Sequence, residues 1–467
     1  MLFNSPSFLF IFLPVALILS RLIKSAKVRN VVLVILSVVF YAFGDLSSMP
    51  ILLASVVLNY AAAAEIADSS SEKARKIFLI AGVIFNILIL AAFKYTSFSK
   101  VLPLGISFFT FQGISYIVDV YRDRSVATKN FIKVFLYIAF FPRLISGPIV
   151  KYHEIYDQLD NPAVTDEKTV LGIERFIFGL AKKAILAFYL TKLADAAFNQ
   201  AYSGQLDFRA AWIGAICYAL QIYFDFSGYS DMAIGLSYML GYRIKENFNL
   251  PYAASSMRDF WRRWHISLSQ WFRDYLYIPL GGSKKGKLRA AINRMIVFLA
   301  TGIWHGSGLT FIIWGIGNGL LVVLEGAGII PAEKLLKSKP GRIVNRIYVI
   351  IAAVVLFAVF RATSLAQAGR MLASMFSFRV LPESMAEFSV YLSPMNIVIA
   401  ALAVAFSGSL WQWIKNRLKL LPDVSFYENH ESAASRVVFA ILLIAVFALS
   451  IMSVARGGFS PFIYSRF

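Results

Sequence analysis

The sequence predicts an all-α, polytopic integral membrane protein, and three observations support this prediction. Hydrophobic residues make up 58% of the 467 residues and charged residues only 15%, with a mean hydropathy of +0.67. A soluble chain carries far more charge, about 25%. The apolar residues also recur in blocks long enough to cross the roughly 30 Å hydrocarbon core of a bilayer. We therefore expect roughly 11 to 13 transmembrane helices, together with re-entrant or interfacial helices.

The apolar blocks give the candidate spans in chain order. The stretch near residues 8–19 has no basic residue before it and no small-residue cleavage site, so we interpret it as a retained first span. Several later blocks are too long or too broken to be simple spans. The candidates lie near residues 7–24, 29–46, 49–67, 77–93, 130–150, 171–200, 208–240, 290–304, 309–327, 346–362, 394–414 and 436–455.

The charge distribution predicts an orientation. The formal net charge is +20 and the pI is about 9.8, which in a soluble protein could indicate a nucleic-acid partner. Here the cations lie in short connections, so the positive-inside rule explains them better, and we expect membrane lipids and no nucleic acid as surroundings. Residues 21–29 and 69–76 are basic and predicted to be cytoplasmic, whereas residues 44–50 contain no cation and suit the outer face. The single cysteine, Cys217, excludes an intrachain disulfide.

Three apolar segments carry residues that are unusual in a membrane span. Residues 102–113 and 141–148 are interrupted by Pro and Gly, which favours broken or re-entrant helices buried among others, with an ordinary kink as the alternative. Residues 223–231 contain Asp225 and Asp231. A carboxylate at membrane depth lines a cavity or pairs with a cation, or it caps a helix after a break. We expect a cap for Asp231 and leave both interpretations open for Asp225.

Residues 258–277 have the period of a helix with two different faces. Such a helix suits the cytoplasmic interface, with its indole rings at the depth of the lipid headgroups. Its arginines could bind anionic lipid, or they could form a binding face for a polyanionic cofactor, and the spacing leaves both open. A basic run that begins at Lys284 follows. One face comprises Arg258, Arg262, His265, Ser269 and Arg273, and the other comprises Trp261, Trp264, Leu268, Trp271 and Tyr275.

His305 lies deep in the next apolar block. Eleven residues of helix separate it from Arg294 and rise about 16 Å, close to half of the hydrocarbon core. An ionisable side chain at that depth is a functional candidate, and burial favours a neutral imidazole that can accept a proton. Gly302, Gly306 and Gly308 permit a close backbone approach or a helix break. The alternative is a buried histidine that only bonds to a neighbouring helix.

The remaining histidines, His153 and His430, are predicted to be solvated loop residues. The four histidines are far apart in the sequence and Cys217 stands alone, so we expect no metal site. No serine or cysteine has the context of an activated nucleophile, and no P-loop or dinucleotide fingerprint occurs.

Six motifs together resemble the membrane-bound O-acyltransferase (MBOAT) family over most of the chain. They fit its bacterial branch of AlgI-like polysaccharide O-acetyltransferases better than the related DltB-like D-alanyl transferases. The motifs are Gly105–Gln112, Phe141–Pro148, Phe224–Gly235, Glu246–Asn249, Asp259–Ser269 and Trp304–Gly306.

The resemblance implies an enzyme in which His305 is the catalytic histidine. His265, 40 residues earlier, occupies the family's second signature polar position. The implied fold is one membrane-embedded domain over residues 1–467, with N-terminal helices (1–100), a catalytic core (101–327) and C-terminal helices (328–467). It consists of tilted helices around a thin central zone with a tunnel between the two faces. Where the family often has a further histidine, this chain has Asn318.

The resemblance also implies a reaction. Acetyl-CoA, as donor, would dock at the basic cytoplasmic face with Arg258, Arg262 or Lys284 near its phosphates. His305 would act as general base, and His265 would orient the donor or relay a proton. The acceptor would be a hydroxyl of an exported polysaccharide or of an extracytoplasmic SGNH-like acetyltransferase partner, at the bacterial inner membrane. D-alanyl transfer to teichoic acid and a non-enzymatic transporter are the alternatives.

Overall fold

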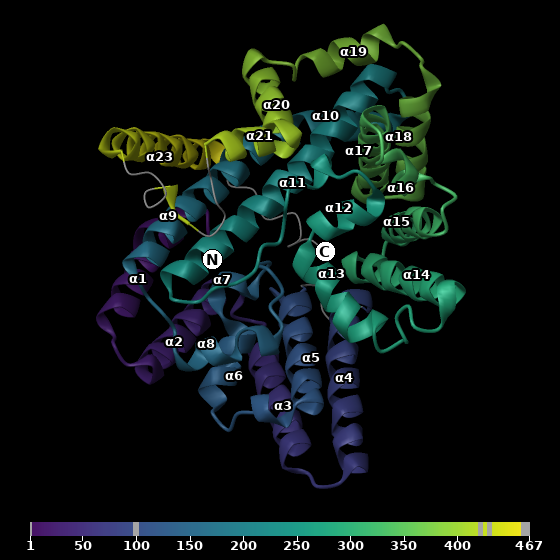
Figure 1. Cartoon of the computed structure of the whole chain (residues 1–467). Helices are drawn as coiled ribbons and strands as arrows, with labels where there is room; N and C mark the ends of the chain where they lie inside the picture. Colours follow the sequence, from purple (N-terminus) through teal and green to yellow (C-terminus); the bar gives the residue numbers. More distant parts are fainter. Residues whose placement is uncertain (1, 97–101, 419–423, 427–431, 459–467) are drawn as a thin grey trace.

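The computed structural model is helical throughout the part of the chain that it describes, which confirms the all-α prediction. The helices do not form a parallel bundle. In Figure 1, α3 (Met49–Asp68), α4 (Glu72–Tyr95) and α5 (Ile106–Arg122) run side by side. The helices α14 (Gly286–His305) and α23 (Ala433–Ser453) lie elsewhere in the view and run in a roughly perpendicular direction. The described residues are 2–96, 102–418, 424–426 and 432–458.

Further helices surround these five. The further helices are α1 (Leu13–Leu22), α2 (Ala26–Asp45), α6 (Phe131–Ala139), α7 (Phe141–Leu144), α8 (Tyr156–Asp160), α9 (Asp166–Ala181), α10 (Phe188–Ser203), α11 (Phe208–Met239), α12 (Met257–Arg263), α13 (Ile266–Phe272), α15 (Leu309–Gly326), α16 (Ala332–Leu335), α17 (Lys339–Arg361), α18 (Leu365–Ser377), α19 (Pro382–Ser389), α20 (Pro394–Ser407) and α21 (Ser409–Arg417).

The protein is a multi-pass membrane protein. Among the described residues, six helices are long and apolar enough to cross a membrane, namely α2, α3, α4, α15, α17 and α23. The pair α19 and α20, bent by 90°, adds a seventh if it is counted as one span. Length and composition therefore support fewer spans than the 11 to 13 expected. One reason is that the block at 130–150 folds as α6 and α7, which are nine and four residues long.

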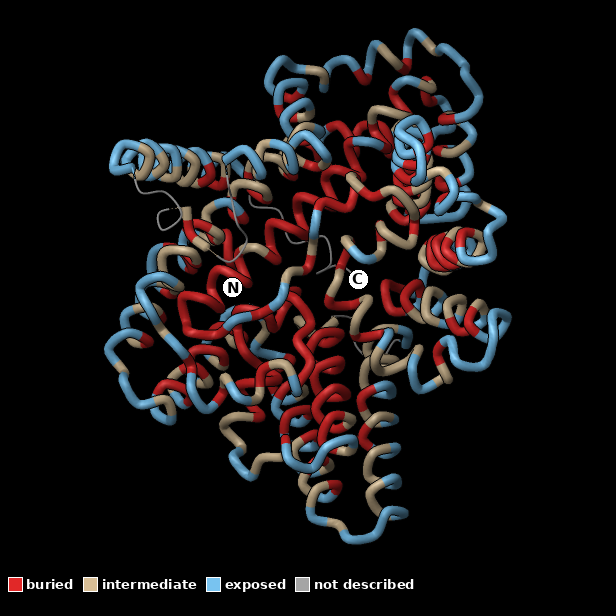
Figure 2. The backbone as a smooth tube through the Cα atoms, viewed as in Figure 1, coloured by how far each residue is buried: buried red, intermediate tan, exposed pale blue. Residues whose placement is uncertain are grey.

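The outer surface of the molecule suits lipid, and its interior is densely packed. Only 11% of the apolar window of α4 and of α23 is buried, and both helices are mostly pale blue and tan in Figure 2. Isoleucines such as Ile77, Ile80 and Ile84 point outward from α4. In contrast, α5 buries nearly all of its side chains. Because α5 is enclosed by protein, it can carry polar groups into the interior.

The two predicted breaks lie against each other. The first break is confined to residues 102–105, because α5 begins at Ile106 directly after Gly105, whose φ of 73° favours glycine. A Cβ atom at Gly105 would collide with the carbonyl oxygen of Leu144, which ends α7 in the second break. The prediction of broken helices buried among others is thus confirmed for both segments, although residues 106–113 are regular helix.

In residues 223–231 the cap predicted for Asp231 is wrong, whereas the interpretation that a buried carboxylate pairs with a cation is confirmed for Asp225. Both aspartates lie within α11, an uninterrupted helix of 32 residues, so neither of them caps a helix. Asp225 forms a buried ion pair with Lys183, and Asp231 pairs with Arg175 at 2.8 Å. Close packing against the chain from α9 onward brings these cations near, because a Cβ atom at Gly228 would lie 2.7 Å from the carbonyl oxygen of Gly179. A cation within reach removes the need for a break, since it offsets the cost of burying the carboxylate.

Candidate active site

A tight hairpin of α14 and α15 positions His305. α14 ends at His305, and α15 begins at Leu309. A Cβ atom at Gly302 would lie 2.5 Å from the carbonyl oxygen of Phe311, and one at Gly315 would lie 2.5 Å from that of Phe298. The prediction for the glycines is confirmed in both respects: Gly302 allows a close approach, and the helix ends just before Gly306.

Aromatic rings enclose the imidazole of His305, which is 3% exposed. Its ring centroid lies 4.8 Å from that of Trp304, 5.1 Å from that of Trp314 and 5.0 Å from that of Phe360. The rings come from α14, α15 and α17. They hold the imidazole in a largely apolar environment, where a group that exchanges a proton is protected from bulk water.

His305 lines a cavity, which we name the His305 cavity. Its other lining residues are Lys94, residues 102–108, Ile145 and Trp304. The Lys94 ammonium donates a hydrogen bond to the carbonyl oxygen of Trp304, and the Tyr95 hydroxyl donates one to that of Ile303. These bonds satisfy carbonyl groups that the end of a helix leaves without an internal partner. The end of α4 thus fixes the end of α14 at the cavity wall.

A second cavity is lined by four arginines, and we name it the basic cavity. The arginines are Arg258, Arg262, Arg273 and Arg294. Arg258 pairs with Glu333 at 2.9 Å and Arg273 with Asp274 at 2.7 Å. Within the described residues, Arg262 and Arg294 form no ion pair. The aromatic rings of Trp261, Phe272, Tyr277 and Phe298 complete much of the wall.

The basic cavity therefore suits a polyanion with an apolar or planar part. Guanidinium groups bind phosphate oxygens in pairs, and aromatic rings stack on planar groups. The sequence predicted Arg258 and Arg262 as binding residues. It did not predict Arg273 and Arg294, which also line this cavity. Arg273 was recognised only as part of a helix face. Arg294 comes from α14, and no spacing within residues 258–277 could connect it to them.

The helix predicted over residues 258–277 is divided into three pieces. α12 ends at Arg263, Trp264 is extended, His265 has a φ of 42°, and a π-helical turn over Arg273–Tyr277 follows α13. The prediction of indole rings at headgroup depth is wrong for Trp264 and Trp271, which are 1% and 6% exposed. Tertiary packing overrides the period here, because the Trp264 ring packs against those of Phe248 and Phe357, with centroids 5.1 and 4.9 Å away.

Asn247 holds the break at His265. Its side-chain oxygen lies 3.2 Å from Nδ1 of His265 and accepts a 2.8 Å hydrogen bond from the Ser267 hydroxyl. The backbone carbonyl oxygen of Asn247 accepts a 2.9 Å hydrogen bond from the backbone N–H of Ile266. The His265 ring lies 6.3 Å from that of Trp304, the same indole that contacts His305. His265 lines neither cavity, so it reaches the site through Trp304.

α5 contacts the surroundings of both cavities. Ile106 and Phe108, at the start of α5, line the His305 cavity. At its other end, Arg122 donates a 2.7 Å hydrogen bond to the carbonyl oxygen of Asp274, next to Arg273 in the basic cavity. The 17 residues of α5 span about 25 Å.

The comparisons with known proteins agree with this geometry. The sequence model of the MBOAT, membrane-bound O-acyltransferase family, matches residues 120–329. The "Probable alginate O-acetylase AlgI" of Pseudomonas putida is 36% identical over 496 residues, covering 100% of both chains. This chain belongs to the membrane-bound O-acyltransferase family. The resemblance of the six motifs is confirmed, and the chain is an O-acyltransferase.

Two further relatives show the range of the family around this chain. The "Peptidoglycan O-acetyltransferase" of Helicobacter pylori is 37% identical over 374 residues, which are 70% of this chain and 71% of the relative. The "Teichoic acid D-alanyltransferase" of Bacillus subtilis is 32% identical over 234 residues, which are 47% of this chain and 58% of the relative. The similarity thus extends further along the O-acetyltransferases than along the D-alanyltransferase.

Two residues singled out by the sequence have distinct places in this O-acyltransferase. Lys284 is exposed in the turn before α14 and lines neither cavity, so the structure does not bring it together with Arg258 and Arg262. Asn318, where the family often has a histidine, is 2% exposed and faces Trp261, whose indole N–H donates a 3.2 Å hydrogen bond to its side-chain oxygen.

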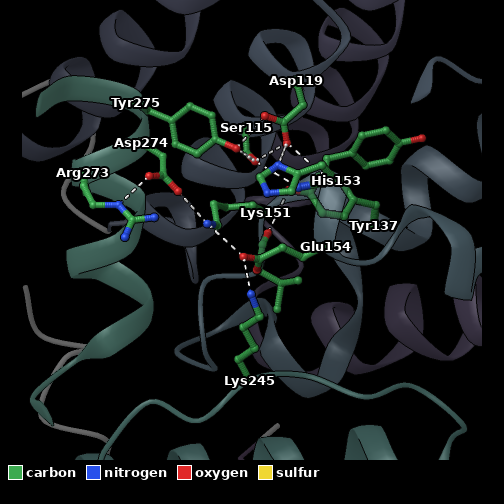
Figure 3. A network of polar contacts seen from close by, with 12 residues as sticks. Ser115, Asp119, Tyr137, Lys151, His153, Glu154, Lys245, Arg273, Asp274 and Tyr275 are labelled. Carbon is green, nitrogen blue, oxygen red and sulfur yellow. Dashed lines mark hydrogen bonds and ion pairs between the residues drawn. The ribbon is translucent and has the colours of Figure 1, made fainter. Parts of the chain in front are cut away.

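His153 is more than a solvated loop residue. Figure 3 shows its imidazole turned toward Asp119, with Nδ1 2.9 Å from the carboxylate, although 44% of the side chain is exposed. The same carboxylate group accepts a 2.8 Å hydrogen bond from the Tyr275 hydroxyl. The network therefore ties the π-helical turn, which carries Arg273, to α5. His430 lies outside the described residues.

Ion pairs extend this network through Asp274. Burial favours its neutral form, but the hydrogen bonds from Arg273 and Lys151 outweigh burial and lower the pKa of Asp274 below its usual value. Asp274 is thus ionised at neutral pH and holds both cations.

In the described part of the chain, no three His, Cys, Asp or Glu side chains come together as a metal site requires.

Proposed function

We propose that this chain transfers an acetyl group from acetyl-CoA in the cytoplasm to a hydroxyl group on the outer side of the bacterial inner membrane. The acceptor hydroxyl belongs to an exported polysaccharide or to an extracytoplasmic SGNH-like acetyltransferase. The observation that carries the proposal is the pair of cavities. Along α14, Thr301 lines the basic cavity and Trp304 lines the His305 cavity, so roughly one helical turn separates them.

Hydrogen bonds between loops support the assignment of sides. Arg124 donates a 2.8 Å bond to the carbonyl oxygen of Ser69, in the basic connection that the positive-inside rule places in the cytoplasm. Arg122 bonds to Asp274 beside the basic cavity, so this cavity belongs to the same side. The 24 residues of α4 span about 36 Å and carry the chain to Lys94, at the His305 cavity and the outer face.

The basic cavity supplies the donor site in this proposal. Acetyl-CoA carries several phosphate groups on a long chain with an adenine ring, which matches guanidinium groups interspersed with aromatic rings. We assign the phosphates to Arg258 and Arg262, together with Arg273 and Arg294. Lys284, as an exposed charge outside the cavity, contributes to attraction over a distance and less to direct contact.

His305 performs the proton transfer. Its imidazole accepts the proton of the acceptor hydroxyl while the hydroxyl oxygen attacks the thioester carbonyl carbon. The carbon–sulfur bond then breaks, CoA leaves as a thiolate that takes up the proton, and an oxygen ester remains. Positioning of the two reactants at one imidazole supplies much of the rate enhancement. His265 takes part through Trp304, whose indole it helps to hold against His305.

The relatives support acetyl as the group that is transferred. The two relatives with the longer alignments are named for O-acetylation of alginate and of peptidoglycan, whereas the D-alanyltransferase matches 47% of this chain. Both polymers lie outside the cytoplasmic membrane and carry free hydroxyl groups. An exported polysaccharide is therefore the acceptor class that we propose.

A vesicle experiment tests the proposal. Inside-out membrane vesicles containing the protein receive radiolabelled acetyl-CoA outside, with alginate or peptidoglycan fragments and an SGNH acetyltransferase enclosed. We expect labelled esters inside, and a loss of roughly 10²- to 10⁴-fold for His305→Gln, as for removal of a general base. Lys192→Gln in α10 is the matched control, because Lys192 is exposed and lines neither cavity, and it should stay within about threefold of the original rate. Equal rates for His305→Gln and the original chain would remove the catalytic assignment, and labelling only from a D-alanyl carrier would redirect the donor.

A further inference from the structure

A chain of ring contacts leads from the basic cavity to His305. Trp261 lines the basic cavity, and its ring meets that of Trp314 with centroids 5.7 Å apart and an angle of 69° between the planes. Trp314 in turn meets His305 edge to face, with centroids 5.1 Å apart. An acyl group that follows this line of rings from the donor cavity to the imidazole passes these two indoles.

Asn318 fixes the first of these indoles. Its side-chain oxygen accepts the 3.2 Å hydrogen bond from the Trp261 N–H, while its NH₂ group donates a 2.8 Å bond to the carbonyl oxygen of Trp314. Both ends of the amide are thus used, which sets its orientation. Phe298 packs on the other side of Trp261, with centroids 5.1 Å apart and an angle of 71°. The Trp261 ring has a defined position, not a range of rotamers.

The residues on α15 follow one face of the helix. Val322 lines the basic cavity, Asn318 lies one turn further, and Trp314 lies one turn beyond that. Positions four apart stand above one another on a helix, so this face runs from the donor cavity to the imidazole. At the middle of the face, Asn318 places an indole across the route.

We propose that Trp261, positioned by Asn318, is the residue that restricts this enzyme to the smallest acyl groups. The inference rests on the proposed function, because it concerns the acyl group that moves from the donor cavity to His305. An acetyl group adds one methyl to the thioester carbonyl, whereas each further methylene has to fit among rings that are already in contact. One extra methylene at an apolar site changes discrimination by roughly 10- to 200-fold.

The competing explanation is that Trp261 is only part of the packing between α12 and the hairpin. In that case its removal would lower activity with all donors alike. A selectivity residue, in contrast, changes the ratio of rates between donors of different length. The ratio of kcat/KM for acetyl-CoA to that for butyryl-CoA therefore separates the two roles.

The experiment uses the purified full-length chain in lipid nanodiscs, with acetyl-, propionyl- and butyryl-CoA as donors. We expect the original protein to prefer acetyl over butyryl by at least roughly tenfold. Trp261→Ala should reduce this ratio by at least about tenfold, and Asn318→Ala, which keeps the indole but removes its acceptor, should reduce it to a smaller extent. The matched control is Trp212→Ala. Its indole also donates to a carbonyl oxygen, that of Met375 at 2.8 Å, but it lines neither cavity, so the ratio should not change.

The outcomes are distinguishable. A ratio that stays at the original value in Trp261→Ala and Asn318→Ala overturns the inference. If Trp261→Ala loses all transfer, Trp261→Phe replaces it, and a variant series that is folded but inactive with every donor also overturns the inference. Failure of the original protein to transfer acetyl at all would instead refute the proposed function, since the inference concerns only the length of the group.

Discussion

The two cavities of this O-acyltransferase differ in the charges around them. The basic cavity is lined by four arginines, whereas the His305 cavity has Lys94 and His305 together with residues 102–108, Ile145 and Trp304. Guanidinium groups are therefore concentrated where a phosphorylated donor would bind. The imidazole lies apart from these arginines and shares its cavity with one cation, the Lys94 ammonium.

This difference indicates that donor binding and proton transfer are assigned to separate parts of the hairpin of α14 and α15. Groups that contact only the remote part of a substrate supply binding energy, and groups at the reacting bond lower the barrier. Substitutions in the two cavities should therefore have different kinetic signatures. The substitutions below, in order of decreasing expected effect, test whether binding and chemistry are separated in this way.

The largest effect is expected for His305→Gln measured as a split between kcat and KM. The value of kcat should fall roughly 10²- to 10⁴-fold, while the KM for acetyl-CoA should change by less than about threefold, because the amide still fills the space. Steady-state kinetics on the purified protein measures both quantities. A large rise in the donor KM would show that the imidazole also binds the donor and that the two cavities are not functionally separate.

Gly302→Ala should disturb both cavities at once. Its Cβ atom would lie 2.5 Å from the carbonyl oxygen of Phe311, so α14 and α15 have to move apart, at a cost of about 1–3 kcal/mol. We expect a lower midpoint of thermal unfolding and reduced binding as well as reduced turnover. Gly369→Ala in α18 is the control, since no neighbouring atom lies within 4 Å of its Cβ position. An unchanged midpoint for Gly302→Ala would contradict the close approach.

Arg262→Gln should raise the KM for acetyl-CoA about five- to tenfold and leave kcat nearly unchanged. One charged hydrogen bond is worth about 1.5–3 kcal/mol, and solvent screening at the exposed Arg262 reduces that value. Lys284→Gln removes a charge of the same sign outside the cavity and should change the KM by less than about twofold. Equal effects of the two substitutions would mean that overall charge, and not the cavity, attracts the donor.

The smallest effect concerns Asp274 and pH. The pKa of Asp274 is depressed in the folded protein, so its ion pairs stabilise the fold above its unfolded value of about 3.8 and are lost as the pH falls through the folded pKa. We expect the original protein to lose about 2 °C or less of its unfolding midpoint from this source below pH 3.8, relative to Asp274→Asn. Differential scanning fluorimetry at pH 7 and pH 3.5 measures the difference between the two proteins. An identical pH dependence would show that the network does not support the basic cavity.

The sequence was most informative for residue types that have few roles at a given depth in a membrane. The position of His305 at the end of an apolar helix, the glycines beside it and the broken segments around Gly105 and Pro142 could all be predicted, because backbone restrictions and the cost of burying an ionisable group are local properties.

What the sequence could not show depends on contacts between distant segments. The helical period of residues 258–277 predicted one helix, but contacts with Asn247, Phe248 and Phe357 stabilise a break at His265 that no spacing reveals. Asp231 of α11 was assigned to a cap because its partners Arg175 and Lys182 lie more than 40 positions away along the chain. Arg294 was not predicted as part of the basic cavity for the same reason, since it lies outside residues 258–277.

The left-handed backbone at His265 affects how any variant at that position has to be read. A φ of 42° is costly for alanine and more so for a β-branched residue, whereas asparagine and glycine adopt it readily. An alanine scan would therefore combine two losses, the missing ring and a relaxed main chain that displaces the start of α13. Asparagine at this site retains the turn, so only the comparison of His265→Asn with the original protein isolates what the imidazole itself contributes.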